Sequence, residues 1–209
     1  RKIEIRKPEL QTSRFLTIDT IEKRKNMIVN ETVGSTAWAK LIRKAYLLEN
    51  EIYFPEGVFF EDIPWGAFNN FCAERIYILH EYLYHYYVNE HSVVMKKNQD
   101  YYRDMFVVNY YKWNEIERRN VYTAMPEETE FDFIVNYYLA ALNMFAHHYD
   151  TIPLEAFEEM QQFVLDKFPN YSQNPYFNSN LGEKHRMQLY FLDKKMGQKE
   201  LEQLHRILA

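Results

Sequence analysis

The sequence has 209 residues, of which 47% are hydrophobic and 17% aromatic, and its net charge is −5 at pH 7. This composition suits one or two packed domains, and an acidic balance without a basic block argues against nucleic acid as the main partner. The single cysteine, Cys72, excludes an internal disulfide and indicates a reducing, cytoplasmic compartment. No run of about 18 apolar residues occurs, so no membrane-spanning helix is predicted.

Apolar residues at helical spacing predict two helices near the start of the chain. The first is expected at 17–29. The second is expected at 35–50, with Ser35 or Thr36 as its N-cap and Trp38 on its buried face. The apolar stripe of each helix should face the core.

Extended segments and one further helix are expected next. Residues 51–61 carry Pro and Gly and predict a loop. Asp62 is expected to open a helix that ends near residue 73, because Pro64 is tolerated in a first turn. Short strands are predicted at 3–5, 75–79 and 83–87. For the stretch from 75 to 87 a helix is the alternative, since short apolar runs are ambiguous by periodicity.

From Lys97 onward the pattern is helical. Helices punctuated by prolines are expected at 98–119, 129–149, 153–167 and 182–207, and Gly197 predicts a break in the last. We therefore expect an α+β, predominantly helical chain. A mixed unit at 1–95 carries a few short strands, and a helical appendage at 96–209 forms a C-terminal bundle.

Two adjacent acids, Glu61 and Asp62, lie within an aromatic run and are the first candidate site. In a structural interpretation Asp62 caps the following helix by accepting from the N–H of Trp65. In a chemical interpretation, desolvation by aromatic walls raises the pKa of the carboxyl while the helix N-terminus lowers it, which leaves a base for a hydroxyl proton. The two interpretations are compatible, because a cap can also be a base.

Lys40 and Arg43, on the expected helix of Trp38, are candidates for holding an anionic group. The alternative is a solvated helix face. Other catalytic patterns are absent: the seven histidines lack metal-ligand spacing, and HExxH, GxSxG, GxGxxG and Walker A sequences do not occur. Paired acids could also indicate a helical hydrolase, but adjacent carboxylates are badly placed to flank a glycosidic bond.

Five features in order resemble the C-terminal half of a family-two, GT-A-type glycosyltransferase domain. They are a Trp–x–Lys–Leu–x–Arg pattern, a Phe–Pro–x–Gly loop, a Glu–Asp pair, a following Trp, and a Leu–Tyr–x–Tyr run with a later Ser. The residues concerned are Trp38, Lys40, Leu41, Arg43, Phe54, Pro55, Gly57, Glu61, Asp62, Trp65, Leu83, Tyr84, Tyr86 and Ser92. The resemblance covers residues 34–95, and Tyr87 stands where the family often has Arg.

The resemblance implies transfer of a sugar from a nucleotide-sugar donor to a glycan or lipid-linked acceptor, as in bacterial surface-polysaccharide synthesis. Asp62 would be the base, Glu61 would orient it or touch the acceptor, and Trp65 would line the acceptor side. Trp38, Lys40 and Arg43 would help bind substrate.

In this family Mg or Mn bridges the donor diphosphate at an Asp-x-Asp sequence, which does not occur in this chain. We therefore expect an acceptor-side fragment with no metal of its own, inactive without a donor-binding half.

The alternative is a non-catalytic helical interaction module, in which Glu61 and Asp62 only shape the start of a helix. The long helical appendage and the missing Asp-x-Asp favour it. Under either hypothesis, association with a membrane surface and self-association through apolar faces stay open.

Overall fold

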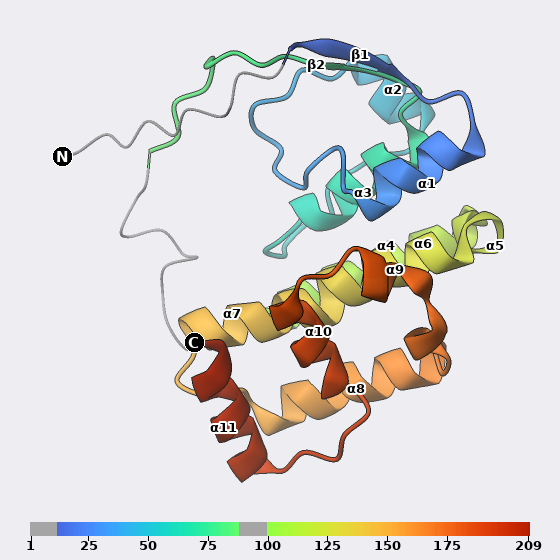
Figure 1. The fold of residues 1–209 in the computed structure, drawn as a ribbon. Helices are drawn as coiled ribbons and strands as arrows, with labels where there is room; N and C mark the ends of the chain where they lie inside the picture. The colour runs from blue at the N-terminus through green and yellow to red at the C-terminus, as the bar shows by residue number, and fades with distance from the viewer. Residues whose placement is uncertain (1–11, 88–99) are drawn as a thin grey trace.

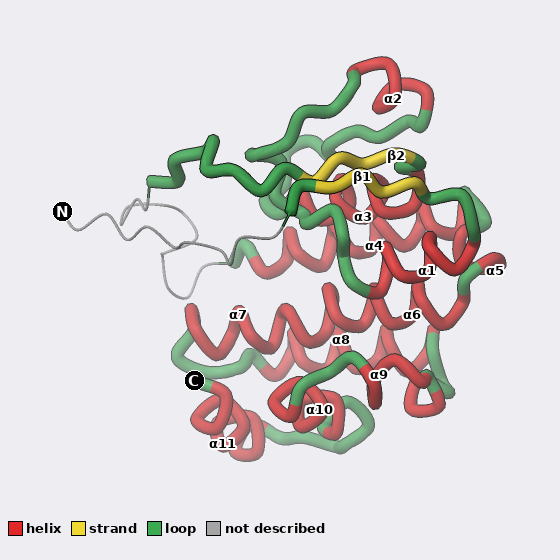
Figure 2. The backbone as a smooth tube through the Cα atoms, turned by 45° about the horizontal axis from the view of Figure 1, so that its top comes forward, coloured by secondary structure: helices red, strands yellow, loops and turns green. Residues whose placement is uncertain are grey.

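The computed structural model describes residues 12–87 and 100–209. The chain is predominantly helical with a small two-stranded sheet at one end (Figures 1 and 2). The N-terminal part contains β1 (Arg14–Thr17), α1 (Ile21–Val29), α2 (Lys44–Glu49), α3 (Asp62–Cys72) and β2 (Arg75–Ile78). The expected strand at 3–5 and Ser92 lie outside the described residues.

Helices make up most of the C-terminal part. In order they are α4 (Tyr102–Arg118), α5 (Val121–Ala124), α6 (Pro126–Ile134), the π-helical segment η2 (Val135–Leu139), α7 (Ala140–His148), α8 (Leu154–Lys167), the 3-10 turn η3 (Tyr171–Gln173), α9 (Pro175–Ser179), α10 (Glu183–Tyr190) and α11 (Gln198–Leu208). The predicted helices are confirmed, with shifted ends. Gly197 separates α10 from α11 as the N-cap of α11, so the expected break is also confirmed.

The sheet pairs β1 with β2 in antiparallel register, Arg14 opposite Ile78 and Thr17 opposite Arg75. One face packs through Leu16 and Ile76 on a small cluster of Ile18, Met27 and Ala73. The strand expected at 75–79 is confirmed, whereas the one expected at 83–87 is wrong. Residues 81–87 are all exposed, so the aromatic run has no buried face that would fix a strand.

The helix expected at 35–50 is largely wrong, because only α2 forms within it. Residues 36–43 are not helical, and Ala39 has a left-handed φ of 58° that no helix accommodates. Tertiary contacts with α3 override the local helical pattern. The side-chain oxygen of Asn70 accepts from the backbone N–H of Val33 at 2.8 Å, and its side-chain nitrogen donates to the backbone carbonyl of Val33 at 2.9 Å.

Gly66 lets this same segment approach α3 closely. A Cβ on Gly66 would lie 2.6 Å from the Cα of Ser35, a distance that no side chain could occupy without moving backbone. The close approach places the stretch from Ser35 to Lys40 beside the start of α3, so a glycine inside a helix positions the candidate site.

The two parts of the chain share one hydrophobic core. It joins Ile28 of α1 and Phe68 of α3 with side chains of α4, α6, α7, α8 and α11. In Figure 1 the N-terminal elements lie along one side of the α4–α6–α7 layer, and α8 to α11 lie along the other. The domain boundary expected near residue 95 falls among residues that the structure does not describe, so it stays a prediction.

Candidate functional site

The Glu61–Asp62 pair lies where a loop turns into α3. Phe60 has a left-handed φ of 63°, and the helix starts two residues later at Asp62. The N-cap is therefore Glu61, which makes no side-chain capping bond, so the prediction that Asp62 caps the helix is wrong by one position. Asp62 instead occupies the first helical turn, where the helix dipole favours a negative charge.

Asp62 is half-buried, and its surroundings favour protonation of its carboxyl. Burial is the main cause that raises its pKa, and the charge of Glu61 raises it further. Its own backbone N–H and the ammonium of Lys40 act in the opposite direction. The carboxyl is thus more basic than an ordinary aspartate, as a proton acceptor requires.

Lys40 is the residue whose positive charge lowers the pKa of Asp62. Its ammonium donates to the carbonyl oxygen of Thr36 and to its hydroxyl, the latter at 3.2 Å. Burial lowers the pKa of Lys40, while Asp62 and Glu31 raise it. Lys40 is therefore held in place by its own loop and faces two carboxylates.

Glu31 is a third carboxylate of the site, and the sequence reasoning missed it. It follows α1 with a left-handed φ of 44°, and its N–H donates to the carbonyl of Ile28 at 3.2 Å. Burial of its carboxyl raises the pKa, and so do the charges of Asp132 and Asp62, whereas Lys112 and Lys40 lower it. An acid after a helix carries no sequence signal of such a role, because the partners come from distant segments.

The charges of a buried ion pair also act on Glu31. Lys112 of α4 donates to Asp132 of α6 at 2.9 Å, and their side chains are 0% and 6% exposed. The side-chain amide of Asn136 donates to the second oxygen of Asp132 at 3.1 Å. Glu31 is therefore influenced both by this buried pair and by Lys40 and Asp62.

The three remaining predicted site residues lie apart from this group. Trp65 is 4% exposed and stacks on Phe54 at 5.3 Å, so it belongs to the core and lines no open acceptor site. Trp38 is 43% exposed and stacks on Tyr84 at 4.9 Å. Arg43 is exposed, with its guanidinium 4.0 Å from the carboxylate of Glu49.

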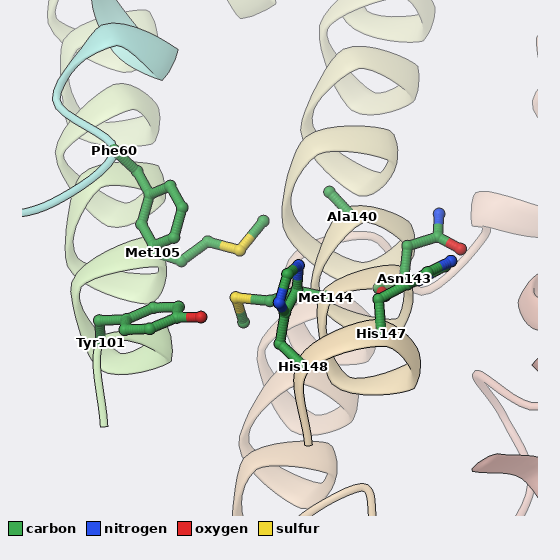
Figure 3. A pocket seen from close by; sticks show the side chains of 8 residues that line it. All are labelled: Phe60, Tyr101, Met105, Ala140, Asn143, Met144, His147 and His148. Atoms are coloured by element: carbon green, nitrogen blue, oxygen red, sulfur yellow. The ribbon is translucent and has the colours of Figure 1, made fainter. Parts of the chain in front are cut away.

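A cavity of about 330 Å³ opens beside the candidate site, between α4 and α7 (Figure 3). Phe60 contributes one wall, but Asp62 does not line the cavity. The lining residues are Phe60, Tyr101, Met105, Ala140, Asn143, Met144, His147 and His148.

No family model, curated protein or solved structure matches this chain. Within residues 12–87 and 100–209, His, Cys, Asp and Glu side chains form no group of three or more that could hold a metal ion. In that same part of the chain, every helix is too short or too polar to cross a membrane. The site therefore has to be interpreted from its own residues.

Proposed function

We propose that the chain is the acceptor-side part of a nucleotide-sugar-dependent glycosyltransferase, with Asp62 as the base. The supporting observation is the environment of Asp62, which is half-buried in the first turn of α3. Its pKa is raised, and the charges of Asp62 and Lys40 act on each other. The ordered motifs of residues 34–95 agree with this role. A bacterial surface polysaccharide is the product that these motifs favour.

In the proposed step Asp62 accepts the proton of an acceptor hydroxyl while that oxygen attacks the anomeric carbon of the donor sugar. The bond from that carbon to the diphosphate oxygen breaks, and the nucleoside diphosphate leaves with the electron pair. Coulombic repulsion from Glu61 raises the pKa of Asp62 and makes the Asp62 carboxyl a better proton acceptor. Lys40 stabilises the ionised form of Asp62 before the proton arrives.

We assign the nucleotide-sugar donor, with the Mg or Mn of such enzymes, to a part of the protein outside these 209 residues, since an Asp-x-Asp sequence is missing from them. The described side chains supply no donor set that fits this ion, so no step is assigned to it. In this proposal the 209-residue chain alone is inactive.

The test is Asp62→Asn in the protein that includes the donor-binding half. Loss of the base should lower kcat by about 10²- to 10⁴-fold with the fold intact, measured as nucleoside diphosphate release. Asp166→Asn on α8, which removes an exposed carboxylate, is the matched control and should keep normal turnover. Near-normal turnover of Asp62→Asn would refute the assignment of the base.

One observation favours the alternative, a non-catalytic helical interaction module. Aromatic side chains are exposed on the sheet and the segment after it, namely Phe15, Tyr77, Tyr82, Tyr84, Tyr86 and Tyr87. Such a surface suits contact with another protein or with a membrane surface. This alternative predicts that Asp62→Asn changes no measurable property, which separates it from the enzyme.

A further inference from the structure

The cavity between α4 and α7 has the composition of a small-molecule site. Two aromatic rings, Phe60 and Tyr101, lie at one side with their centroids 5.8 Å apart. Figure 3 shows Met105 from α4 and Met144 from α7 reaching toward each other between the two helices. The volume of about 330 Å³ lies within the range of ligand pockets.

Two polar residues of the lining, Asn143 and His147, are held by bonds within the protein, and Figure 3 shows their side chains directed away from the gap between α4 and α7. The side-chain oxygen of Asn143 accepts from Gln188 at 3.1 Å, and its amide nitrogen lies 3.3 Å from the imidazole Nε2 of His185. The Nδ1 of His147 donates to the backbone oxygen of Asn143 at 2.7 Å. These groups keep their positions without a ligand, which reduces the entropy lost on binding.

The lining selects the chemical class of the ligand. None of the eight side chains is a carboxylate, an ammonium or a guanidinium, so the cavity offers no permanent charge to pair with a charged group. Aromatic rings and thioethers favour the face and edge of another ring. The imidazole of His148, which lies on the same side of α7 as Met144 (Figure 3), can bond to a hydroxyl or an ether oxygen.

We propose that this cavity binds an uncharged aromatic ring, the non-sugar end of the acceptor. The assignment to an acceptor rests on the proposed function. Phe60 connects the two sites: it is part of the cavity wall, and its Cα lies at most about 7.6 Å from that of Asp62, two residues on. The left-handed backbone of Phe60 fixes the direction of its ring relative to the start of α3.

The experiment uses methionine methyl groups of the 209-residue chain as probes. ¹³C-methyl spectra are recorded with phenyl β-D-glucoside and with methyl β-D-glucoside. The phenyl compound should shift the signals of Met105 and Met144, while the methyl compound should not. The other described methionines serve as internal controls because they lie outside the lining: Met27, Met125, Met160, Met187 and Met196.

A pair of matched variants completes the test. Ala140→Phe fills the cavity and should weaken binding of the phenyl compound by about tenfold or more. Val107→Phe adds the same ring at a position that is 49% exposed and should bind as the unsubstituted chain does. The proposal is overturned if neither cavity methionine shifts, or if Ala140→Phe binds normally.

These spectra report binding and not turnover. The spectra can therefore show no binding even if Asp62→Asn abolishes sugar transfer. Equally, binding of the phenyl compound can be observed even if Asp62→Asn leaves transfer unchanged. If both glucosides shift the Met105 and Met144 signals of the unsubstituted chain equally, the cavity has no preference for an aromatic ring. This outcome refutes the proposal even if Ala140→Phe does not fold.

Discussion

The layer of α4, α6 and α7, with α8 packed on it, and the N-terminal part of the chain both contain many aromatic residues, yet they use them differently. In the layer, rings pack edge to face: Trp113 lies 5.3 Å from Phe133 and 4.9 Å from Phe168, with little or no exposure. In the N-terminal part the rings of Phe59, Trp38 and Tyr84 are between 43% and 50% exposed.

This difference separates a closed core from an open surface. The layer is close-packed, so its rings leave no room for a further group to bind between them. The N-terminal segment instead contains left-handed backbone at Glu31, Ala39 and Phe60, all non-glycine residues near the candidate site. Such backbone costs about 1 kcal/mol or more at each position and persists only where surrounding contacts impose it. Substitutions in the layer should therefore lower stability most, and those in the segments near Asp62 should change it less.

The largest expected effect on stability is that of Phe133→Ala. Phe133 is fully buried and contacts the rings of Trp113, Tyr137, Phe163 and Phe168. Removing it should lower the free energy of unfolding by about 3–5 kcal/mol, measured by urea denaturation.

The control for this change is Val107→Ala, at an exposed position of α4, which should cost less than about 1 kcal/mol. Equal losses in the two variants would contradict the distinction between a close-packed layer and its surface.

The same distinction explains how much of the fold could be predicted. The helices of the layer follow from periodicity, because the sequence from 131 to 150 is apolar nearly all round and Phe131, Phe133, Tyr137, Leu142 and Phe145 are buried. In the N-terminal part, local pattern failed at 35–43, where Asn70 and Gly66 of α3 decide the conformation. Those contacts join residues 31 positions apart (Ser35 and Gly66) and 37 positions apart (Val33 and Asn70), so they leave no local signal.

Prediction of the site was limited for a related reason. Asp62 and Lys40 were found because an acid within an aromatic run and a lysine after a tryptophan stand out in sequence. Glu31 was not found, since its neighbours Asp132 and Lys112 come from α6 and α4. The sequence placed Trp65 on the acceptor side of the site. It is buried instead, because α3 packs on α4 and Trp65 points into the core.

A smaller effect tests whether α3 positions the Ser35–Lys40 segment. Gly66→Ala places a methyl group where the backbone of Ser35 now lies, so the segment must shift. We expect a net loss of about 1–2 kcal/mol in the free energy of unfolding, because the overlap outweighs the better helix propensity of alanine.

Gly34→Ala is the matched control, since a Cβ there meets nothing within 4 Å and its φ is not left-handed. It should leave stability unchanged or slightly raised. If Gly66→Ala is as stable as Gly34→Ala, the close approach does not fix this segment.

The smallest effect concerns the charge of Glu31. Burial raises the pKa of its carboxyl above the ordinary value of 4.5, so the folded chain retains a proton that the unfolded chain has lost. The protonated group favours the fold at low pH, and this contribution is lost as the pH rises from about 4.5 through the folded pKa. Glu31→Gln removes the titration, so its Tm should exceed that of the unsubstituted chain at pH 7.

The difference in Tm should be about 2 °C or less, because much of Glu31 is exposed and solvent screens its charge. It should vanish below about pH 4, where the carboxyl is protonated in both states. Glu158→Gln, at an exposed position of α8, controls for the loss of one surface charge and should show no such pH dependence. A lower Tm for Glu31→Gln at pH 7 would mean that the attraction of Lys40 and Lys112 outweighs burial, and that folding lowers the pKa of Glu31 instead of raising it.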